Sequence, residues 1–479
     1  MKLWTTKKRL IEERRLLPRI SFHVNTHVRE MEFTMRLYAV ALYLILLVTG
    51  LTAFAQPQTM TLEQAKNTAL ERNLSVIQAQ NLNDAAGSGK LAAFGRYLPS
   101  LSANGSWNRR QVEGPTYIQG VSIPGSNVKA TTGSFSAGLS ASLTLFDGFT
   151  RESNLNRANA VFSQDNLAVI RTRQSIVFQV ESSYLNVLRL EQLVKVSDEN
   201  LKRDRRQLER ITESNRVGAL SLADVYRQQS QVAVDELAQI NAQNDFDKGK
   251  ADLVALIGLN IAGEFSFADP AVTGSIDSVD MATTRAKYQN LVDLTRRAMI
   301  ARADFQSVKV GLDAAESGVT SARAGYFPSL SAGAGVTMNN EELRYLFDYK
   351  TIYWGLQLNW TLFDGFGTNA SIQNATVTKR NAEITLAQTE RNIGVEVKKA
   401  LLDLDAAMKQ YDVSQKGLIS ATEDRKIAEE RYNLGAGTLL DLLIANAGLV
   451  NAEANLVNAS YNYIIAKRNV EYVLGERAY

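Results

Sequence analysis

The side chains of this sequence that could do chemistry are mostly carboxylates, because histidine and cysteine are almost absent. The two histidines, His23 and His27, lie within the first thirty residues, and the chain of 479 residues contains no cysteine. A protein without these residues lacks the commonest general base, any thiol nucleophile and the usual zinc ligands. We therefore predict no catalytic, cofactor-binding or metal-binding residues, and the composition argues against a hydrolase.

Two of the carboxylates occupy matching places, each a few residues after a glycine-alanine pair. Gly218-Ala219 precedes Asp224, and Gly435-Ala436 precedes Asp441. The glycine suits a tight turn after one helix, and the Ser or Thr that follows suits the start of the next helix. A carboxylate in the first turn of a helix is also stabilised by the helix dipole, which is a purely structural reason for both aspartates.

Further matches show that these turns belong to an internal repeat. The matching pairs are TLFDGF at 144–149 and 361–366, Gly258 and Gly475, and YLPSLSA at 97–103 with YFPSLSA at 326–332. The first two pairs, like the two aspartates, lie 217 residues apart, and the third lies 229 residues apart. We predict a first structural repeat over 56–258, a linker or equatorial segment over 259–285, and a second repeat over 286–479.

Each repeat is expected to contain a helix, a β-hairpin, a very long helix and a return helix. Strict alternation of apolar with small or polar residues predicts strands with two unlike faces at 100–108, 134–146, 329–338 and 352–362. The 69 residues from Phe149 to Val217 contain no glycine or proline, and could form a helix of roughly 100 Å. Its counterpart covers 368–434, the return helices cover 222–257 and 439–474, and 109–130 and 339–350 are predicted to be exposed hairpin loops.

The strand faces suit a sheet that lies between lipid and water. Trp107, Trp354 and Trp360 lie in or beside these strands, as an aromatic girdle at a membrane interface would require. Four strands cannot close a barrel, and open sheet edges are not tolerated in lipid. Two copies would supply eight strands and three copies twelve, and the small polar inward residues favour three. A soluble β-sandwich with a helical arm is the competing interpretation.

Residues 1–55 are predicted to be an N-terminal extension and signal peptide. Arg36, an apolar stretch from Leu37 to Leu51 and an Ala-x-Ala site ending at Ala55 form the expected pattern, and a retained anchor helix is the alternative. This segment holds 9 of the 53 basic and 4 of the 50 acidic residues, so the remainder has 44 and 46 and a net charge of −2. The excess of basic residues is therefore confined to the predicted signal-peptide segment, and nucleic-acid binding is not predicted.

Taken together, these motifs resemble the TolC family of outer-membrane efflux and secretion proteins. The resemblance covers about Met60 to Gly475, and its most specific part is the C-terminal run Arg431–Gly435 followed by Gly437–Asp441. It implies a homotrimer with a 12-stranded outer-membrane β-barrel, continued by a long periplasmic α-helical barrel with a mixed belt where the long helices are interrupted. The implied partners are outer-membrane lipid, a periplasmic adaptor protein and an inner-membrane pump.

The resemblance also implies roles for the residues at the two turns. Three copies of Asp441 would form an acidic ring that gates the pore and attracts cations, while Asp224 and Tyr432 would help to hold the mouth closed. Gly437 and Ile444 stand where family members can carry a basic and a second acidic residue, so a single ring and a different lock are expected. The adaptor-docking tips would be Gly218, Ala219, Gly435 and Ala436, although turn geometry alone also explains these residues.

We therefore expect a passive duct in the cell outer membrane that extends into the periplasm and has no enzymatic activity. Small-molecule or drug efflux is the preferred role, and type I protein secretion is the alternative. A structural coiled-coil surface protein is the alternative from another class, and the paired strand hairpins argue against it. Metal efflux is disfavoured because the sequence after Ala55 has neither histidine nor cysteine.

Overall fold

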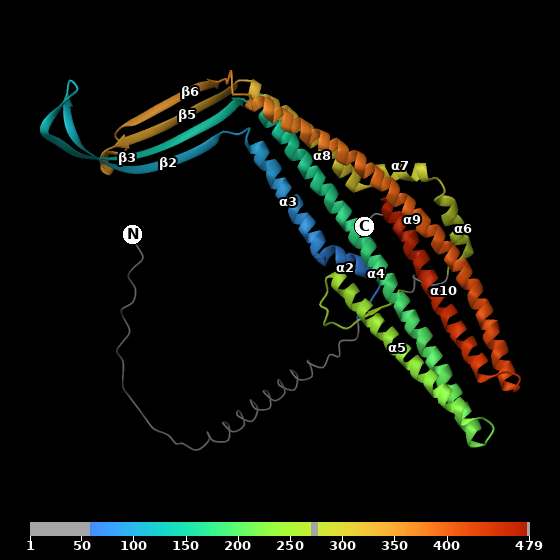
Figure 1. Ribbon diagram of the computed structural model, residues 1–479. Coiled ribbons are helices and arrows are strands. Elements are labelled where there is room, and N and C mark those ends of the chain that lie inside the picture. The colour runs from blue at the N-terminus through green and yellow to red at the C-terminus, as the bar shows by residue number, and fades with distance from the viewer. Residues whose placement is uncertain (1–57, 270–275, 477–479) are drawn as a thin grey trace, which may run out of the picture. The chain divides into compact units, whose positions relative to one another are not determined.

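The computed structural model describes residues 58–269 and 276–476, so the predicted signal peptide and part of the predicted linker lie outside the described residues. Within these ranges six elements occur twice in the same order (Figure 1). The first set is α2 (Leu62–Arg72), α3 (Leu74–Gly95), β2 (Ser100–Ile118), β3 (Val121–Phe146), α4 (Thr150–Arg216) and α5 (Leu222–Ile257). The second set is α7 (Leu291–Ala301), α8 (Ala303–Arg323), β5 (Ser329–Asn340), β6 (Lys350–Asn359), α9 (Gly367–Asn433) and α10 (Leu439–Val473).

The remaining elements are short and lie before the first set, between the two sets, or, for the two 3-10 turns, within the second set. They are β1 (Gln58–Met60), β4 (Phe265–Phe267), α6 (Ser278–Lys287) and the 3-10 turns η1 (Ala324–Tyr326) and η2 (Leu343–Tyr345). Strands β1 and β4 form a two-stranded sheet. The predicted long helices and return helices are confirmed to within one residue at each end.

The four long strands form one antiparallel sheet in the order β2-β3-β5-β6. The prediction of a loop over 109–130 is wrong, because β2 and β3 stay paired as far as Ile118 and Val121. Gln119 and Gly120 make the reversal, with φ of 51° and 82°, which is the left-handed geometry of a tight hairpin turn. The register shifts after Pro115, which lacks an amide proton for the ladder. The predicted loop between β5 and β6 is confirmed.

The repeated TLFDGF motif forms the turn from strand to long helix. Phe149 and Phe366 both have positive φ, at 73° and 70°, and directly precede α4 and α9. The aspartate of each motif accepts a hydrogen bond from a backbone amide in the first turn of that helix, Asp147 from Arg151 at 3.1 Å and Asp364 from Thr368 at 2.6 Å. The motif recurs because each copy must both reverse the chain and cap a helix.

The helices pack side by side in two overlapping sets. In one set, neighbouring helices follow the order α3-α4-α8-α9. Further along the same long helices, the other set follows the order α5-α4-α10-α9. The expectation of interrupted long helices is wrong, since α4 and α9 each run for 67 residues without a break. The interruptions lie in the shorter helices, at Asn73 between α2 and α3 and at Arg302 between α7 and α8.

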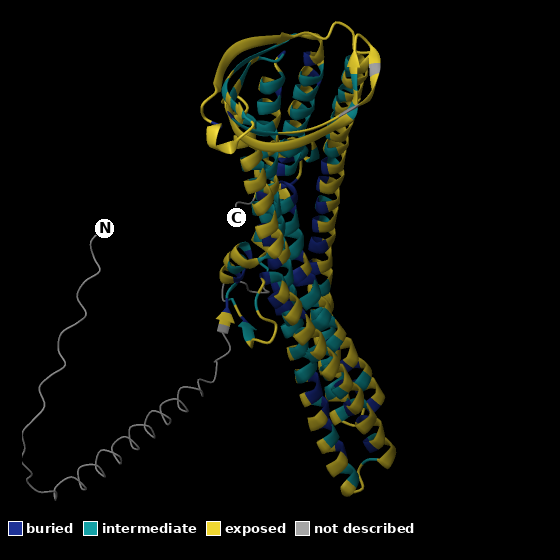
Figure 2. Ribbon diagram, turned by 90° about the vertical axis from the view of Figure 1, so that its left-hand side faces the viewer, coloured by how far each residue is buried: buried dark blue, intermediate teal, exposed yellow. Residues whose placement is uncertain are grey.

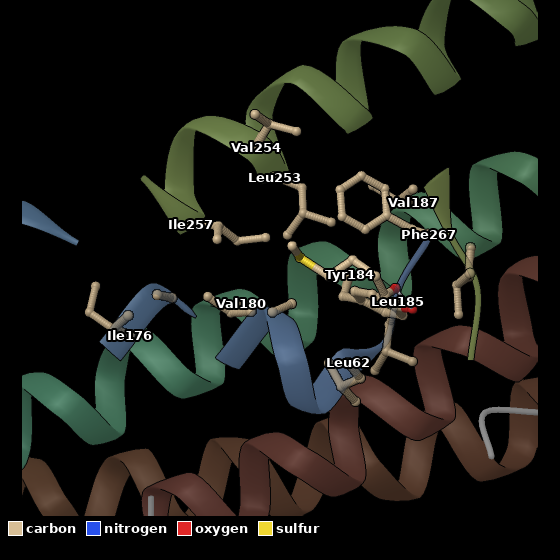
Figure 3. Close-up of a cluster of buried hydrophobic side chains, with 14 of the residues drawn as sticks. Leu62, Ile176, Val180, Tyr184, Leu185, Val187, Leu253, Val254, Ile257 and Phe267 are labelled. Carbon is tan, nitrogen blue, oxygen red and sulfur yellow. Dashed lines mark hydrogen bonds between the residues drawn. The ribbon is translucent and has the colours of Figure 1, made fainter. Parts of the chain in front are cut away.

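Among the described residues, the hydrophobic core is divided among three clusters within the helical part. The largest joins α2, α4, α5 and β4, and Tyr184 lies at its centre, donating a hydrogen bond to the Met60 carbonyl at 2.9 Å (Figure 3). Buried residues run along the helices, whereas the outer strands β2 and β6 are largely exposed and β5 is mostly half-buried (Figure 2). Among the described residues, no helix combines the length and apolarity that membrane crossing needs.

Candidate functional site

The sheet has one apolar face and one hydroxyl-rich face. Opposite serines of β2 and β3 bring their hydroxyls to 2.7 Å in three pairs, Ser100 with Ser142, Ser102 with Ser140, and Ser106 with Ser136. The alternate positions carry large apolar side chains that no other part of the described chain covers: Leu101, Leu139, Ile352, Trp354, Leu356 and Leu358. Because one face suits an apolar medium and the other suits water, the sheet is built to separate the two.

The three predicted girdle tryptophans lie at different levels of this sheet. Trp107 stacks on Phe135 with ring centroids 6.2 Å apart, beside the last β3–β5 pair at Asn340. Trp360 follows the opposite end of the sheet, where its indole nitrogen donates to the Tyr326 carbonyl at 3.2 Å. Trp354 lies between these ends and is 85% exposed. Two of the three residues therefore flank the apolar face, and the third lies within it.

The first of the two turns that connect a long helix to its return helix joins α4 to α5. Gly218 has a φ of 80°, and Ser221 caps α5 by accepting a hydrogen bond from the Asp224 amide at 3.2 Å. The Asp224 carboxylate accepts a 2.7 Å hydrogen bond from the Ser221 hydroxyl and lies 3.2 Å from the Arg227 guanidinium. This aspartate is thus held within its own turn as the sequence predicts for a first-turn carboxylate.

The second turn, between α9 and α10, is built in the same way. Gly435 has a φ of 73°, and Thr438 and Asp441 form a reciprocal capping box. The Thr438 amide and hydroxyl donate to the Asp441 carboxylate at 3.0 and 2.8 Å. These hydrogen bonds, and the more distant Arg431, hold the pKa of Asp441 below its usual range. Asp441 is solvent-exposed and stays ionised at neutral pH.

The two turns meet through a small hydrophobic cluster that contains Ile211, Val225 and Leu439, with Tyr432 packed against it. Burial and the nearby charge of Asp224 raise the pKa of Tyr432, while Arg210 opposes this shift. The Tyr432 hydroxyl is buried and has no hydrogen-bond partner among the described residues. The structure therefore brings Tyr432 near Asp224, whereas Asp441 makes its contacts within its own turn.

A row of arginines on α4, which the sequence analysis did not single out, ties the two hairpins together. Arg189 donates to the Asn458 side chain at 2.6 Å, Arg203 lies 3.5 Å from Glu453, and Arg210 lies 3.9 Å from Glu429. The signal was present in the sequence, because Arg203 and Arg210 are one heptad apart and Arg189 is two heptads before Arg203. Among the described residues, no cluster of acidic, histidine or cysteine side chains could hold a metal ion.

A sheet with one lipid-suited face, joined to paired long helices that end in capped turns, defines an outer-membrane channel protein rather than an enzyme. The family model described as outer membrane efflux protein matches residues 66–259 and 294–476. The chain belongs to this family, and the resemblance to TolC-type proteins, the outer-membrane location and the lack of enzymatic activity are confirmed.

Individual relatives agree with this assignment. The probable efflux pump outer membrane protein TtgC of Pseudomonas putida is 26% identical over 385 residues, which cover 79% of this chain and 75% of TtgC. The CmeC outer membrane channel of Campylobacter jejuni has the same fold, with a TM-score of 0.72, 19% identity, and coverage of 86% of this chain and 85% of CmeC. The outer membrane protein VceC of Vibrio cholerae gives a TM-score of 0.72 at 18% identity, over 86% of this chain and 96% of VceC.

Proposed function

We propose that three copies of this chain form the outer-membrane exit duct of a tripartite export system. The open edges of the sheet carry this proposal. Strands β2 and β6 each have one neighbouring strand within the described chain, although the apolar face suits lipid. Unpaired strand edges are not tolerated in lipid, so the edges must pair with further copies. Three copies supply twelve strands, and the small hydroxyl-bearing inward side chains leave room for a water-filled lumen.

The helices support the same assembly. The outer helices of each set, α3 and α5 on one side and α9 on the other, expose large apolar side chains, among them Leu82, Leu237, Ile384 and Val413. In a closed ring, α9 of one copy would cover α3 and α5 of the next and continue the β-barrel as a periplasmic helical barrel. We propose the repeat division 56–258, 259–285 and 286–479 as the unit of this construction.

The two turns form the periplasmic end in this proposal. Asp441 supplies an acidic ring at the mouth, and Asp224 and Tyr432 support the closed state. Gly218, Ala219, Gly435 and Ala436 form the tips that meet a periplasmic adaptor bound to an inner-membrane pump. An added Cβ on Gly218 or Gly435 would meet no atom within 4 Å, so both tips are open to a close approach. Trp107 and Trp360 bound the lipid-facing band, with Trp354 inside it.

The cargo in this proposal is a small molecule, and the duct does no chemistry of its own. Relatives named as antibiotic and toluene efflux pump outer membrane proteins support small-molecule efflux over type I protein secretion. Opening would be a two-state rearrangement of the helical tips, driven by the partners.

Native mass of the protein extracted from purified outer membranes in mild detergent tests the assembly. A trimer that conducts ions in a planar bilayer is the expected result. A monomer, or recovery in the soluble periplasmic fraction, would mean that the four strands close no barrel.

Loss of dye efflux in a deletion strain, with protein secretion unchanged, would separate efflux from secretion.

A further inference from the structure

The seam between α4 and α5 contains several buried polar side chains, beyond the turn that joins the two helices. Its buried polar side chains are Asn200, Asp204 and Gln207 from α4, and Gln228 and Asp235 from α5, and they lie among buried apolar residues such as Leu201 and Val232. Asp204 is 2% exposed and Asp235 is 6% exposed, although acidic side chains are rarely buried without a cation. A helical hairpin of this kind normally fills such positions with apolar residues. The two carboxylates therefore require a specific explanation.

The two aspartates lie opposite each other across the seam, because the next residues along the two helices, Arg205 and Glu236, form a 2.7 Å ion pair. One Asp235 oxygen accepts a hydrogen bond from the Gln231 side chain at 3.0 Å, and its other oxygen is buried without a hydrogen-bond partner among the described residues. One Asp204 oxygen is equally unpartnered, while the Gln228 amide donates to the Asp204 backbone carbonyl at 3.1 Å. Two ionised carboxylates cannot hydrogen-bond to each other, because each is an acceptor only, whereas a single proton between these two facing groups would give their unpartnered oxygens a hydrogen bond.

The charged groups around this pair do not neutralise it. On α4, the Arg203 guanidinium lies 3.5 Å from both the Asn200 side chain and the Glu453 carboxylate of α10. Arg205 of α4 and Glu236 of α5 form a 2.7 Å ion pair at the surface. The pKa of Asp235 is raised to about 7, mainly by burial and secondly by the neighbouring Asp204.

The second hairpin offers a comparison within the same chain. At the 217-residue offset of the repeat, Asp204 and Asp235 correspond to Ala421 and Ala452. Gln228 corresponds to Ala445, which is buried in the α9–α10 seam. The second seam is therefore made of small and apolar side chains at these places, and it has no counterpart of the carboxyl pair.

We propose that Asp204 and Asp235 form a shared-proton site that sets how tightly α4 packs on α5. When the site holds its proton, the two carboxyl groups are joined by a hydrogen bond. When the proton leaves, two buried negative charges face each other and the seam loosens. The first hairpin thereby responds to periplasmic pH, and the second does not. This inference concerns a single chain and does not depend on the proposed trimer or its partners.

The direction of the pH response follows from proton linkage. Asp235 binds its proton more tightly in the folded hairpin than in an unfolded chain, so the stabilisation is fully present at low pH. It declines as the pH rises above the ordinary range of an aspartate and is lost once the pH passes about 7. The hairpin is thus expected to be tight in mildly acidic conditions and looser in mildly alkaline conditions.

Hydrogen–deuterium exchange of the full chain in mild detergent, at about pH 5.5 and about pH 8.5 on either side of the titration, tests this proposal. Protection of the α5 peptides is divided by that of the α10 peptides at each pH, which removes the intrinsic pH dependence of amide exchange. In the wild type, this ratio should fall by roughly tenfold to thirtyfold between the two conditions.

Asp235→Asn replaces the pair by a neutral isostere and should keep the ratio constant across this pH range. Asp204→Asn provides a second variant with the same expectation. Asp247→Asn is the matched control, because Asp247 is an exposed carboxylate of α5 that lies 3.8 Å from Lys250, and it should keep the wild-type response. A wild-type ratio that is equal at both pH values, or a fall that persists in both seam variants, would overturn the proposal.

Discussion

Asn73 and Arg302 occupy corresponding helix breaks, and each donates a side-chain hydrogen bond to a backbone carbonyl at the end of a return helix. The Asn73 amide reaches the Leu256 carbonyl at 2.9 Å, and the Arg302 guanidinium reaches the Val473 carbonyl at 3.4 Å. Leu256 and Val473 are equivalent at the 217-residue offset of the repeat. Two different side chains thus serve one structural task in the two repeats.

Arg302 has a second task, because it is 3% exposed and also binds Asp304 at 2.6 Å and Glu396 at 2.5 Å. We predict that Arg302→Met lowers the free energy of unfolding by about 2–3 kcal/mol, since the two carboxylates lose their partner but keep partial contact with water. Thermal unfolding followed by circular dichroism checks this value. Arg296→Met removes an exposed ion pair with Asp293 and should change the stability by less than about 0.5 kcal/mol.

The two faces of β6 predict opposite responses to the same substitution. Leu356 lies on the apolar face and Gln357 on the polar face of the strand. Leu356→Arg would place a charge in lipid at a cost of about 2–4 kcal/mol, so the assembled protein should nearly disappear from the outer membrane. Gln357→Arg should assemble normally. Immunoblots of outer-membrane fractions measure both, and equal abundance of the two variants would contradict the assignment of the faces.

Asp441 both caps α10 and carries the proposed pore charge, and two variants separate these roles. Asp441→Asn removes the charge but keeps an acceptor for the Thr438 amide, so cation selectivity should fall. Thr438→Ala weakens the cap but keeps the charge, so selectivity should remain. Because the pKa of Asp441 is lowered, the wild-type selectivity should persist until the pH falls below the ordinary range of an aspartate. Reversal potentials in planar bilayers distinguish the cases, and unchanged selectivity in Asp441→Asn would exclude the ring.

Because the Tyr432 hydroxyl has no hydrogen-bond partner among the described residues, we predict that its removal does not destabilise the protein. Tyr432→Phe removes a buried polar group without a partner, so stability should stay equal or rise by up to about 1 kcal/mol. Tyr226→Phe is the matched control, since Tyr226 is 62% exposed on α5. If Tyr432→Phe instead destabilises the assembled protein or raises its resting conductance, the hydroxyl must be bound by a group from another copy.

Local rules were enough to predict much of this fold from the sequence. The return helix over 222–257 has the predicted bounds, because glycine after one helix and a serine cap before the next act within a few residues. The long helices were predictable because no proline interrupts them. The segment 109–130 was mistaken for a loop because Pro115, Gly120 and Pro124 are local turn signals. Gly120 does make the turn, whereas β2 and β3 pair on both sides of Pro115 and of Pro124.

Only the tertiary structure decided which distant side chains share a site. The sequence by itself determined the repeat, the two faces of the strands, the capped turns and the family. It did not reveal that Arg302 is buried against Glu396, that Tyr432 lies near Asp224, or that Asp204 meets Asp235. Each of these contacts joins separate helices, so it depends on how the helices pack and not on the spacing of residues along the chain. Burial then changes the chemistry, because a carboxylate that would be ionised in water takes up a proton once a second one faces it in a dry seam.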